Sequence, residues 1–150
     1  MMQAQMLAPA AILIAWSLVM LFWMAGTRLP ALAKSGAMKD AKPGGRGQDL
    51  DGVLPDNLQW KAHNYNHLME QPTIFYAATI ILAMMGAAAG DVLAAWIYVG
   101  LRIVHSVFQA TINVVKVRLL IFLLSSLVMV YLAWRAIAVT LFHDPSIVTG

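Results

Sequence analysis

The chain contains no cysteine and very little charge, and each shortage excludes a class of protein. Without cysteine it forms no disulfide, holds no cysteine-ligated metal and uses no thiolate of its own in catalysis. Charged residues make up 11% of the 150 residues, whereas hydrophobic residues make up 61%, and the mean hydropathy is +0.72. A soluble domain needs a far more polar surface. The composition therefore indicates a membrane protein.

Four long apolar runs account for most of the hydrophobic residues. They cover about residues 7–26, 69–89, 92–115 and 119–142. Each is close to the ~20 residues that an α-helix needs to cross the hydrocarbon core of a bilayer. Because the later runs are joined by short connections, neighbouring helices must be antiparallel. We predict one all-α domain over residues 1–150, an integral membrane four-helix up-down bundle with a long connection over about 34–59.

The basic residues are concentrated at one end of the predicted bundle. The isoelectric point is about 9.5, but most cations lie in or beside the first connection, and the third connection holds Lys116 and Arg118. The second connection holds none. Cytoplasmic connections carry an excess of Lys and Arg, so the pattern predicts that both termini lie away from the cytoplasm. It is a topology signal and does not indicate nucleic-acid binding; Arg135, near the far end of the fourth run, is an exception.

Two of the predicted helices carry a polar face at membrane depth. On the second helix, spacings of three, one and three residues place four side chains on one face: His63, Asn66, His67 and Glu70. On the third, spacings of three, four and four do the same: Arg102, His105, Gln109 and Asn113. An ionisable side chain in the bilayer costs about 2.5–3.5 kcal/mol on insertion scales, so such residues face a partner or a site. These two faces form the candidate site.

Glu70 and Arg102 are the natural ion pair between the two faces. Counted from the cytoplasmic ends of their helices, both fall in the middle third of the bilayer, where either charge alone is costly. The pair either holds the bundle together or supports a ligand site. It predicts that Glu70→Gln destabilises the protein more than a lipid-facing substitution does.

Other polar residues at the same end have two interpretations each. His63, His67 and His105 form either a metal triad or hydrogen bonds between helices; the His-Glu-x-x-His pattern is missing, so we predict no metal site. Lys116 and Arg118 either anchor the helices at the membrane surface or clamp an anion. Since acidic residues are scarce nearby, an anionic ligand or lipid head group is a plausible partner for them.

Two segments of the predicted second and third helices carry a family resemblance. They read His63-Asn-Tyr-Asn-His-Leu-Met-Glu-Gln-Pro72 and Ala95-Trp-Ile-Tyr-Val-Gly-Leu-Arg-Ile-Val-His105. With the four spans and the long first connection, they resemble the MAPEG superfamily, the membrane-associated proteins of eicosanoid and glutathione metabolism, most closely its bacterial branch. The resemblance implies homotrimers with sites between subunits that open to the cytoplasm. It also implies glutathione as cosubstrate, its thiol joined to a lipophilic electrophile or used to reduce one.

The resemblance extends to single residues, with matches and substitutions. Glu70 matches the buried acid that the family carries on its second helix, and Arg102 matches its arginine on the third. His67 stands where the family usually has Asn, and His63 where the glutathione transferases usually have Arg. The framework residues therefore match, whereas residues that handle glutathione are replaced.

The third and fourth helices show the same mixture. His105 and Gln109 occupy positions where the eicosanoid branch carries tyrosines. Lys116, with Arg118 as its rival, falls where that branch carries the cation credited with activating the thiol. Under the resemblance, Lys116 or Arg118 is the catalytic cation that stabilises the thiolate or a carboxylate, and Asn66 joins the polar faces that bind the ligand.

Two functional hypotheses follow. In the first, this is a protein of the bacterial inner membrane that acts as a glutathione-dependent transferase or peroxidase on lipophilic electrophiles. In the second, it is a noncatalytic lipid-binding or scaffold trimer whose pocket holds an acyl chain. The expected partners are membrane lipid, and glutathione or another small anionic ligand. A proton or ion path along the polar faces is disfavoured, because the chain has no inverted repeat and no pair of interrupted helices.

Overall fold

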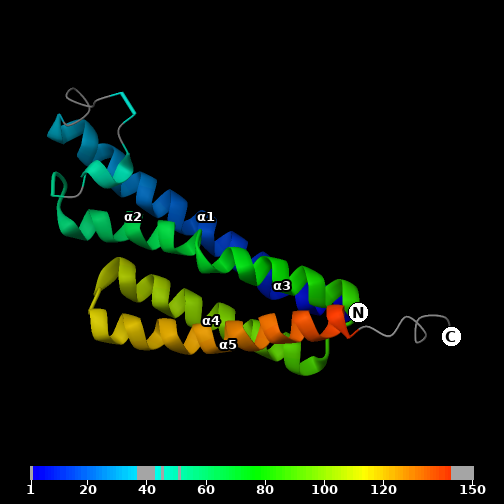
Figure 1. Cartoon of the computed structure of the whole chain (residues 1–150). Helices are drawn as coiled ribbons and strands as arrows, with labels where there is room; N and C mark the ends of the chain where they lie inside the picture. Colours follow the sequence, from blue (N-terminus) through cyan, green and yellow to red (C-terminus); the bar gives the residue numbers. More distant parts are fainter. Residues whose placement is uncertain (1, 37–42, 45, 51, 143–150) are drawn as a thin grey trace.

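All regular elements in the described part of the protein are helices. The computed structural model describes residues 2–36, 43–44, 46–50 and 52–142, and no strand occurs within them. The elements are α1 Met2–Ser35, the short 3-10 helix η1 Gly47–Leu50, α2 Asp56–Leu68, α3 Gln71–Met85, α4 Ala89–Thr111 and α5 Val115–Leu141 (Figure 1). Of the predicted long connection over 34–59, residues 37–42, 45 and 51 lie outside the described residues.

The helices supply four segments long and apolar enough to cross a membrane. These are α1, the α2–α3 pair taken together as Asp56–Met85, α4 and α5. The predicted all-α bundle of four spans is therefore confirmed. The second segment begins well before residue 69, because α2 is a polar helix whose Gln59 and Asn64 are buried against its neighbours. Hydropathy alone places the start of such a helix too late.

The helices run back and forth along one long axis (Figure 1). α1 lies beside α2 and α3, and α4 and α5 form a hairpin packed against them. We call the end with the α1–α2 connection and the α4–α5 turn the long-loop end. The opposite end, with the α3–α4 connection, the start of α1 and the end of α5, is the tight-turn end. This arrangement places cations of the connections at the long-loop end.

The core combines large apolar side chains with a few polar links between helices. Phe75 of α3 stacks on Tyr98 of α4 with ring centroids 4.4 Å apart, and both side chains are fully buried. Ser106 of α4 accepts hydrogen bonds from Trp16 of α1 at 2.9 Å and from Asn64 of α2 at 2.8 Å. Within a membrane, such hydrogen bonds and close packing hold helices together, because the lipid supplies no hydrophobic driving force between them.

The second span is broken at residues 69–70. α2 ends at Leu68, Glu70 has the non-helical dihedrals φ −90° and ψ −96°, and Pro72 lies in the first turn of α3. Proline lacks the backbone N–H and disfavours a helical residue before it, so a helix interrupted here restarts most readily with proline in its first turn. The break leaves backbone carbonyls at the end of α2 without their helical partners.

The tight-turn end is closed by an ion pair whose carboxylate is buried. Asp91, in the first turn of α4, is fully buried and accepts from Arg135 of α5 at 2.9 and 3.1 Å. Its carboxylate also accepts from the Tyr131 hydroxyl at 3.0 Å and from the Ala88 backbone N–H at 2.9 Å. Gly86, with φ 101°, ends α3 in the left-handed region that glycine tolerates. Arg135, the exception to the charge pattern, thus has an internal partner.

Candidate functional site

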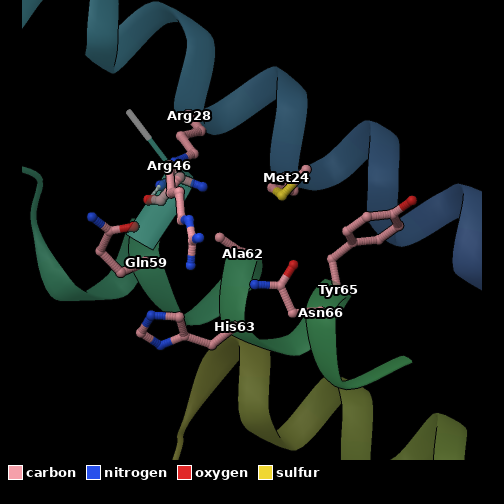
Figure 2. Close-up of a pocket in the computed structure, with 9 residues that line it drawn as sticks. Met24, Arg28, Arg46, Gln59, Ala62, His63, Tyr65 and Asn66 are labelled. Carbon is pink, nitrogen blue, oxygen red and sulfur yellow. Dashed lines mark hydrogen bonds between the residues drawn. The ribbon is translucent and has the colours of Figure 1, made fainter. Parts of the chain in front are cut away.

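Among the described residues, two pockets with polar linings lie at the long-loop end. The larger, about 410 Å³, lies between α1, α2 and the connection that joins them, and we call it the arginine pocket. Its polar lining comprises Arg28, Arg46, Gln59, His63 and Asn66. Figure 2 shows Arg28 from α1 and Arg46 from the connection converging above the face of α2 that carries Gln59 and His63. Cations from two separate segments therefore meet over one cavity.

Hydrogen bonds of the α1–α2 connection hold Arg28 and Arg46 near each other. The Arg28 guanidinium donates to the Gly47 carbonyl, which ties the connection to α1. A β-carbon at Gly47 would lie 3.4 Å from an Arg28 nitrogen, so the Arg28 side chain lies directly against this part of the connection. The Arg46 N–H donates to the Asp49 carboxylate at 2.7 Å, and the Asp49 N–H donates back to the Arg46 carbonyl at 3.0 Å. This local turn fixes the backbone from which the Arg46 side chain extends.

The smaller pocket, about 170 Å³, lies between α2, α4 and α5, and we call it the histidine pocket. It is lined by His67, His105, Val115, Arg118, Leu119 and Phe122. The His67 ring stacks on Phe122 with centroids 5.2 Å apart and lies 5.2 Å from the His105 ring. His105 is 2% exposed and has no hydrogen-bond partner among the described residues. The pocket thus combines two imidazoles, a guanidinium and an aromatic wall.

The predicted Glu70–Arg102 ion pair is wrong for the described chain. Glu70 is exposed and its carboxylate accepts from His67 Nδ1 at 2.8 Å, while Arg102 is 1% exposed and donates to the His67 backbone carbonyl at 2.9 Å. The cause is the break in the second span, which leaves that carbonyl free at the C-terminal, negative end of α2. The two predicted partners are therefore linked through His67 and do not touch.

The two candidate catalytic cations differ in their surroundings. Arg118 is half-buried, lines the histidine pocket and donates to the Asn113 side-chain carbonyl at 2.7 Å. Asn113 has φ 54°, a left-handed conformation that turns α4 into α5 and aims its amide at Arg118. Lys116 is exposed on the first turn of α5 and lines neither pocket.

The predicted binding residues are thus divided between two pockets. His63 and Asn66 line the arginine pocket, and His67, His105 and Arg118 line the histidine pocket. The others lie beside the pockets: Glu70 and Arg102 contact His67, and Gln109 is buried with its side-chain carbonyl unpartnered among the described residues.

Sequence reasoning missed Arg28, Arg46 and Phe122 as lining residues. The available signal was the cluster of cations in the first connection, which we interpreted only as a marker of topology. Within the described residues, no group of three or more His, Asp or Glu side chains is placed to hold a metal ion.

Comparison with known proteins supports the resemblance noted in the sequence. The model of the MAPEG family matches residues 6–138, which is most of the chain. No curated protein and no solved structure matches. The family match and the four apolar helical segments together identify an integral membrane protein.

Proposed function

The chain belongs to the MAPEG family, and on this premise we propose that it binds glutathione and uses the thiol to conjugate or reduce a lipophilic electrophile. The arginine pocket carries the proposal. Glutathione has two carboxylates, and guanidinium groups are the side chains best suited to bind carboxylates, through paired N–H donors. Arg28 and Arg46 supply two such groups over one cavity, with His63 and Asn66 as further hydrogen-bonding groups.

The sizes of the two pockets suit different parts of the reaction, with glutathione bound in the arginine pocket and the thiol and electrophile in the histidine pocket. Sites for small molecules usually measure about 300–1,000 Å³, so the arginine pocket at about 410 Å³ has room for the body of glutathione. The histidine pocket at about 170 Å³ is smaller and suits only a thiol and the reacting part of an electrophile. Its Phe122 and Leu119 side chains offer an apolar wall to a substrate that arrives from the lipid.

Arg118 is our choice for the catalytic cation. A nearby positive charge stabilises a thiolate relative to a thiol, as it does for reactive protein cysteines. Arg118 lines the histidine pocket and is held in place by Asn113, whereas Lys116 is exposed and lines neither pocket. Lys116 then contributes long-range attraction of the anionic ligand to the long-loop end.

We further propose a homotrimer in a bacterial inner membrane, with the long-loop end in the cytoplasm. The cations of this end support the orientation, because cytoplasmic connections are rich in Lys and Arg. Exposed apolar side chains along α5 support contact with lipid or with neighbouring subunits, among them Leu120, Leu127 and Trp134. In such a trimer the sites lie between neighbouring subunits and open to the cytoplasm, as the family resemblance implies.

A second candidate function is a noncatalytic lipid-binding or scaffold trimer. A third pocket of about 280 Å³ favours it, because the lining comes from one apolar face of α4: Ile103, Val104, Val107, Phe108, Thr111 and Ile112. A groove of this kind suits an acyl chain and offers almost nothing to a charged tripeptide.

Titration calorimetry of glutathione into the purified protein in detergent distinguishes the two functions. We expect binding by the wild type, a loss of affinity of about tenfold in Arg118→Ala and a loss below about threefold in Lys116→Ala. Absence of binding to the intact oligomer contradicts the glutathione proposal. Lipid that copurifies and is displaced by added fatty acid then supports the scaffold function.

A further inference from the structure

His67 and Glu70 form a carboxylate–imidazole dyad at the edge of the histidine pocket. His67 Nδ1 lies 2.8 Å from Glu70 Oε2, and the His67 ring lines the cavity. Resting on the proposed glutathione function, we infer that His67 is a catalytic base that takes the thiol proton, and that Glu70 is the positioning residue that orients it. In this arrangement His67 removes the thiol proton and Arg118 stabilises the thiolate. Under the family resemblance, a cation alone activates the thiol.

The geometry selects one nitrogen of the ring. Since Nδ1 is occupied by the carboxylate, the neutral imidazole keeps its proton on Nδ1 and leaves Nε2 as the acceptor. None of the described residues forms a hydrogen bond with Nε2. A base oriented by a hydrogen-bonded third group, with its free nitrogen beside a pocket, is the usual arrangement for activating a nucleophile.

His67 is held from three directions. Phe122 stacks on its ring with an interplanar angle of 28°, Arg102 binds its backbone carbonyl at 2.9 Å, and Glu70 binds Nδ1. Because Arg102 is almost completely buried, the backbone at His67 cannot shift without losing that hydrogen bond. The base is therefore preorganised, although it lies at a break between two helices.

His105 is the rival base, and the contacts disfavour it. It lies in the same pocket, but no carboxylate or carbonyl among the described residues orients its ring. Two guanidinium groups also lie on its side of the cavity, Arg118 in the lining and Arg102 against Phe122. Positive neighbours disfavour a second positive charge on the imidazole. His105 is suited instead to donate a hydrogen bond to the thiolate.

The reaction balances without any redox partner when the electrophile is a lipophilic α,β-unsaturated carbonyl compound. The S–H bond breaks, its electron pair stays on sulfur and its proton goes to His67 Nε2. The thiolate forms an S–C bond with the β-carbon, and the displaced π pair passes to the carbonyl oxygen as an enolate. The imidazolium then returns the proton to the enolate, so His67 ends neutral. The Arg118 guanidinium stabilises the negative charge throughout.

A mechanism with His67 as base and a mechanism with a cation alone differ in where the thiol proton goes, and this difference can be measured. If His67 takes it, glutathione binds as a thiolate while the proton stays in the site. If a cation alone stabilises the thiolate, the proton is released to the buffer. Calorimetry in two buffers of different ionisation enthalpy measures that release, and the ultraviolet absorbance of the thiolate measures ionisation directly. Both use the intact oligomer in detergent.

The variants are Glu70→Gln, which keeps the shape and the imidazole, and His67→Asn, which restores the residue type usual in the family. Thr140→Val, on the exposed far end of α5, is the control. We expect wild type and control to show thiolate absorbance without proton release. Both dyad variants should lose thiolate absorbance or release a proton on binding, and their conjugation rate should fall about 100-fold or more. Glu70→Gln alone decides the matter if His67→Asn does not fold.

S-methylglutathione, which has no thiol proton, separates the two proposals. Its affinity should change little in the dyad variants, because the arginine pocket is intact. Proton release by the wild type, or an unchanged thiolate signal without proton release in Glu70→Gln, overturns the dyad and leaves glutathione binding standing. No binding of either ligand to the wild type overturns the proposed function, and the inference with it.

Discussion

The two ends of the bundle treat buried charge in opposite ways. At the tight-turn end, the fully buried Asp91 has Arg135, Tyr131 and a backbone N–H as partners. In the half of the bundle nearer the long-loop end, the equally buried Arg102 donates to one carbonyl, and its Nε and Nη1 find no partner among the described residues. The buried carboxylate near the tight-turn end therefore has charged and hydrogen-bonding partners, whereas the buried guanidinium of Arg102 has two nitrogens without one.

This difference indicates which buried charges stabilise the fold and which serve a ligand site. Buried polar groups in folded proteins are nearly always satisfied, so an exception requires an explanation such as a ligand or a bound water. The unsatisfied end is also the end with both polar pockets. We therefore expect substitutions at the tight-turn end to change stability, and substitutions at the long-loop end to change ligand binding more than stability.

The largest expected effect on stability is at Arg135. Arg135→Gln leaves the Asp91 carboxylate buried without a charged partner, which should lower the free energy of unfolding by about 3 kcal/mol. Denaturant unfolding in detergent, followed by circular dichroism, measures the change. Thr140→Val on the same helix should stay within about 0.5 kcal/mol. A loss for Arg135→Gln no greater than the control's would break the comparison.

A smaller effect is expected at Arg102. Arg102→Met leaves the His67 carbonyl without its donor, but it also removes a buried charge whose hydrogen bonds are incomplete, so the two costs partly offset. The same unfolding measurement should show a loss of about 1 kcal/mol, together with weaker glutathione binding. A loss equal to that of Arg135→Gln would show that Arg102 is as structural as the Asp91 pair.

Asn113 allows backbone strain to be separated from the tether on Arg118. Asn113→Ala should cost about 1 kcal/mol of stability, because alanine tolerates a φ of 54° less well than asparagine. Asn113→Gly accepts the backbone and loses only the hydrogen bond to Arg118. It should leave the unfolding curve nearly unchanged and weaken glutathione binding about threefold. Equal unfolding curves for the two variants would rule out strain at this turn.

The smallest expected effect on stability is at Glu70. Its side chain is exposed and forms an ion pair with His67, so Glu70→Gln should change the free energy of unfolding by less than about 0.5 kcal/mol. The sequence-based pairing with Arg102 predicts a large loss instead. Unfolding of Glu70→Gln beside Arg102→Met decides between them, since a true pair would give similar losses in both.

Much of the fold could be predicted because its signals are local. Apolar runs of bilayer length predict spans, and helical spacing predicts which side chains share a face. His63 with Asn66, and Arg102 with His105 and Gln109, do lie on the faces expected. The apolar run predicted from residue 69 is shorter than the Asp56–Met85 segment, because the polar side chains of α2 are covered by other helices and hydropathy does not detect such burial.

What the sequence determined by itself was the class of protein, the helical spans, the polar faces and the family, since composition and periodicity act over a few turns of chain. Only the tertiary structure decided the partners. Asp91 pairs with Arg135 across the α4–α5 hairpin. Arg102 donates to the His67 backbone carbonyl, which has no helical partner because the helix breaks there. Partner choice depends on which helix ends meet in space and on backbone groups that no residue type reveals.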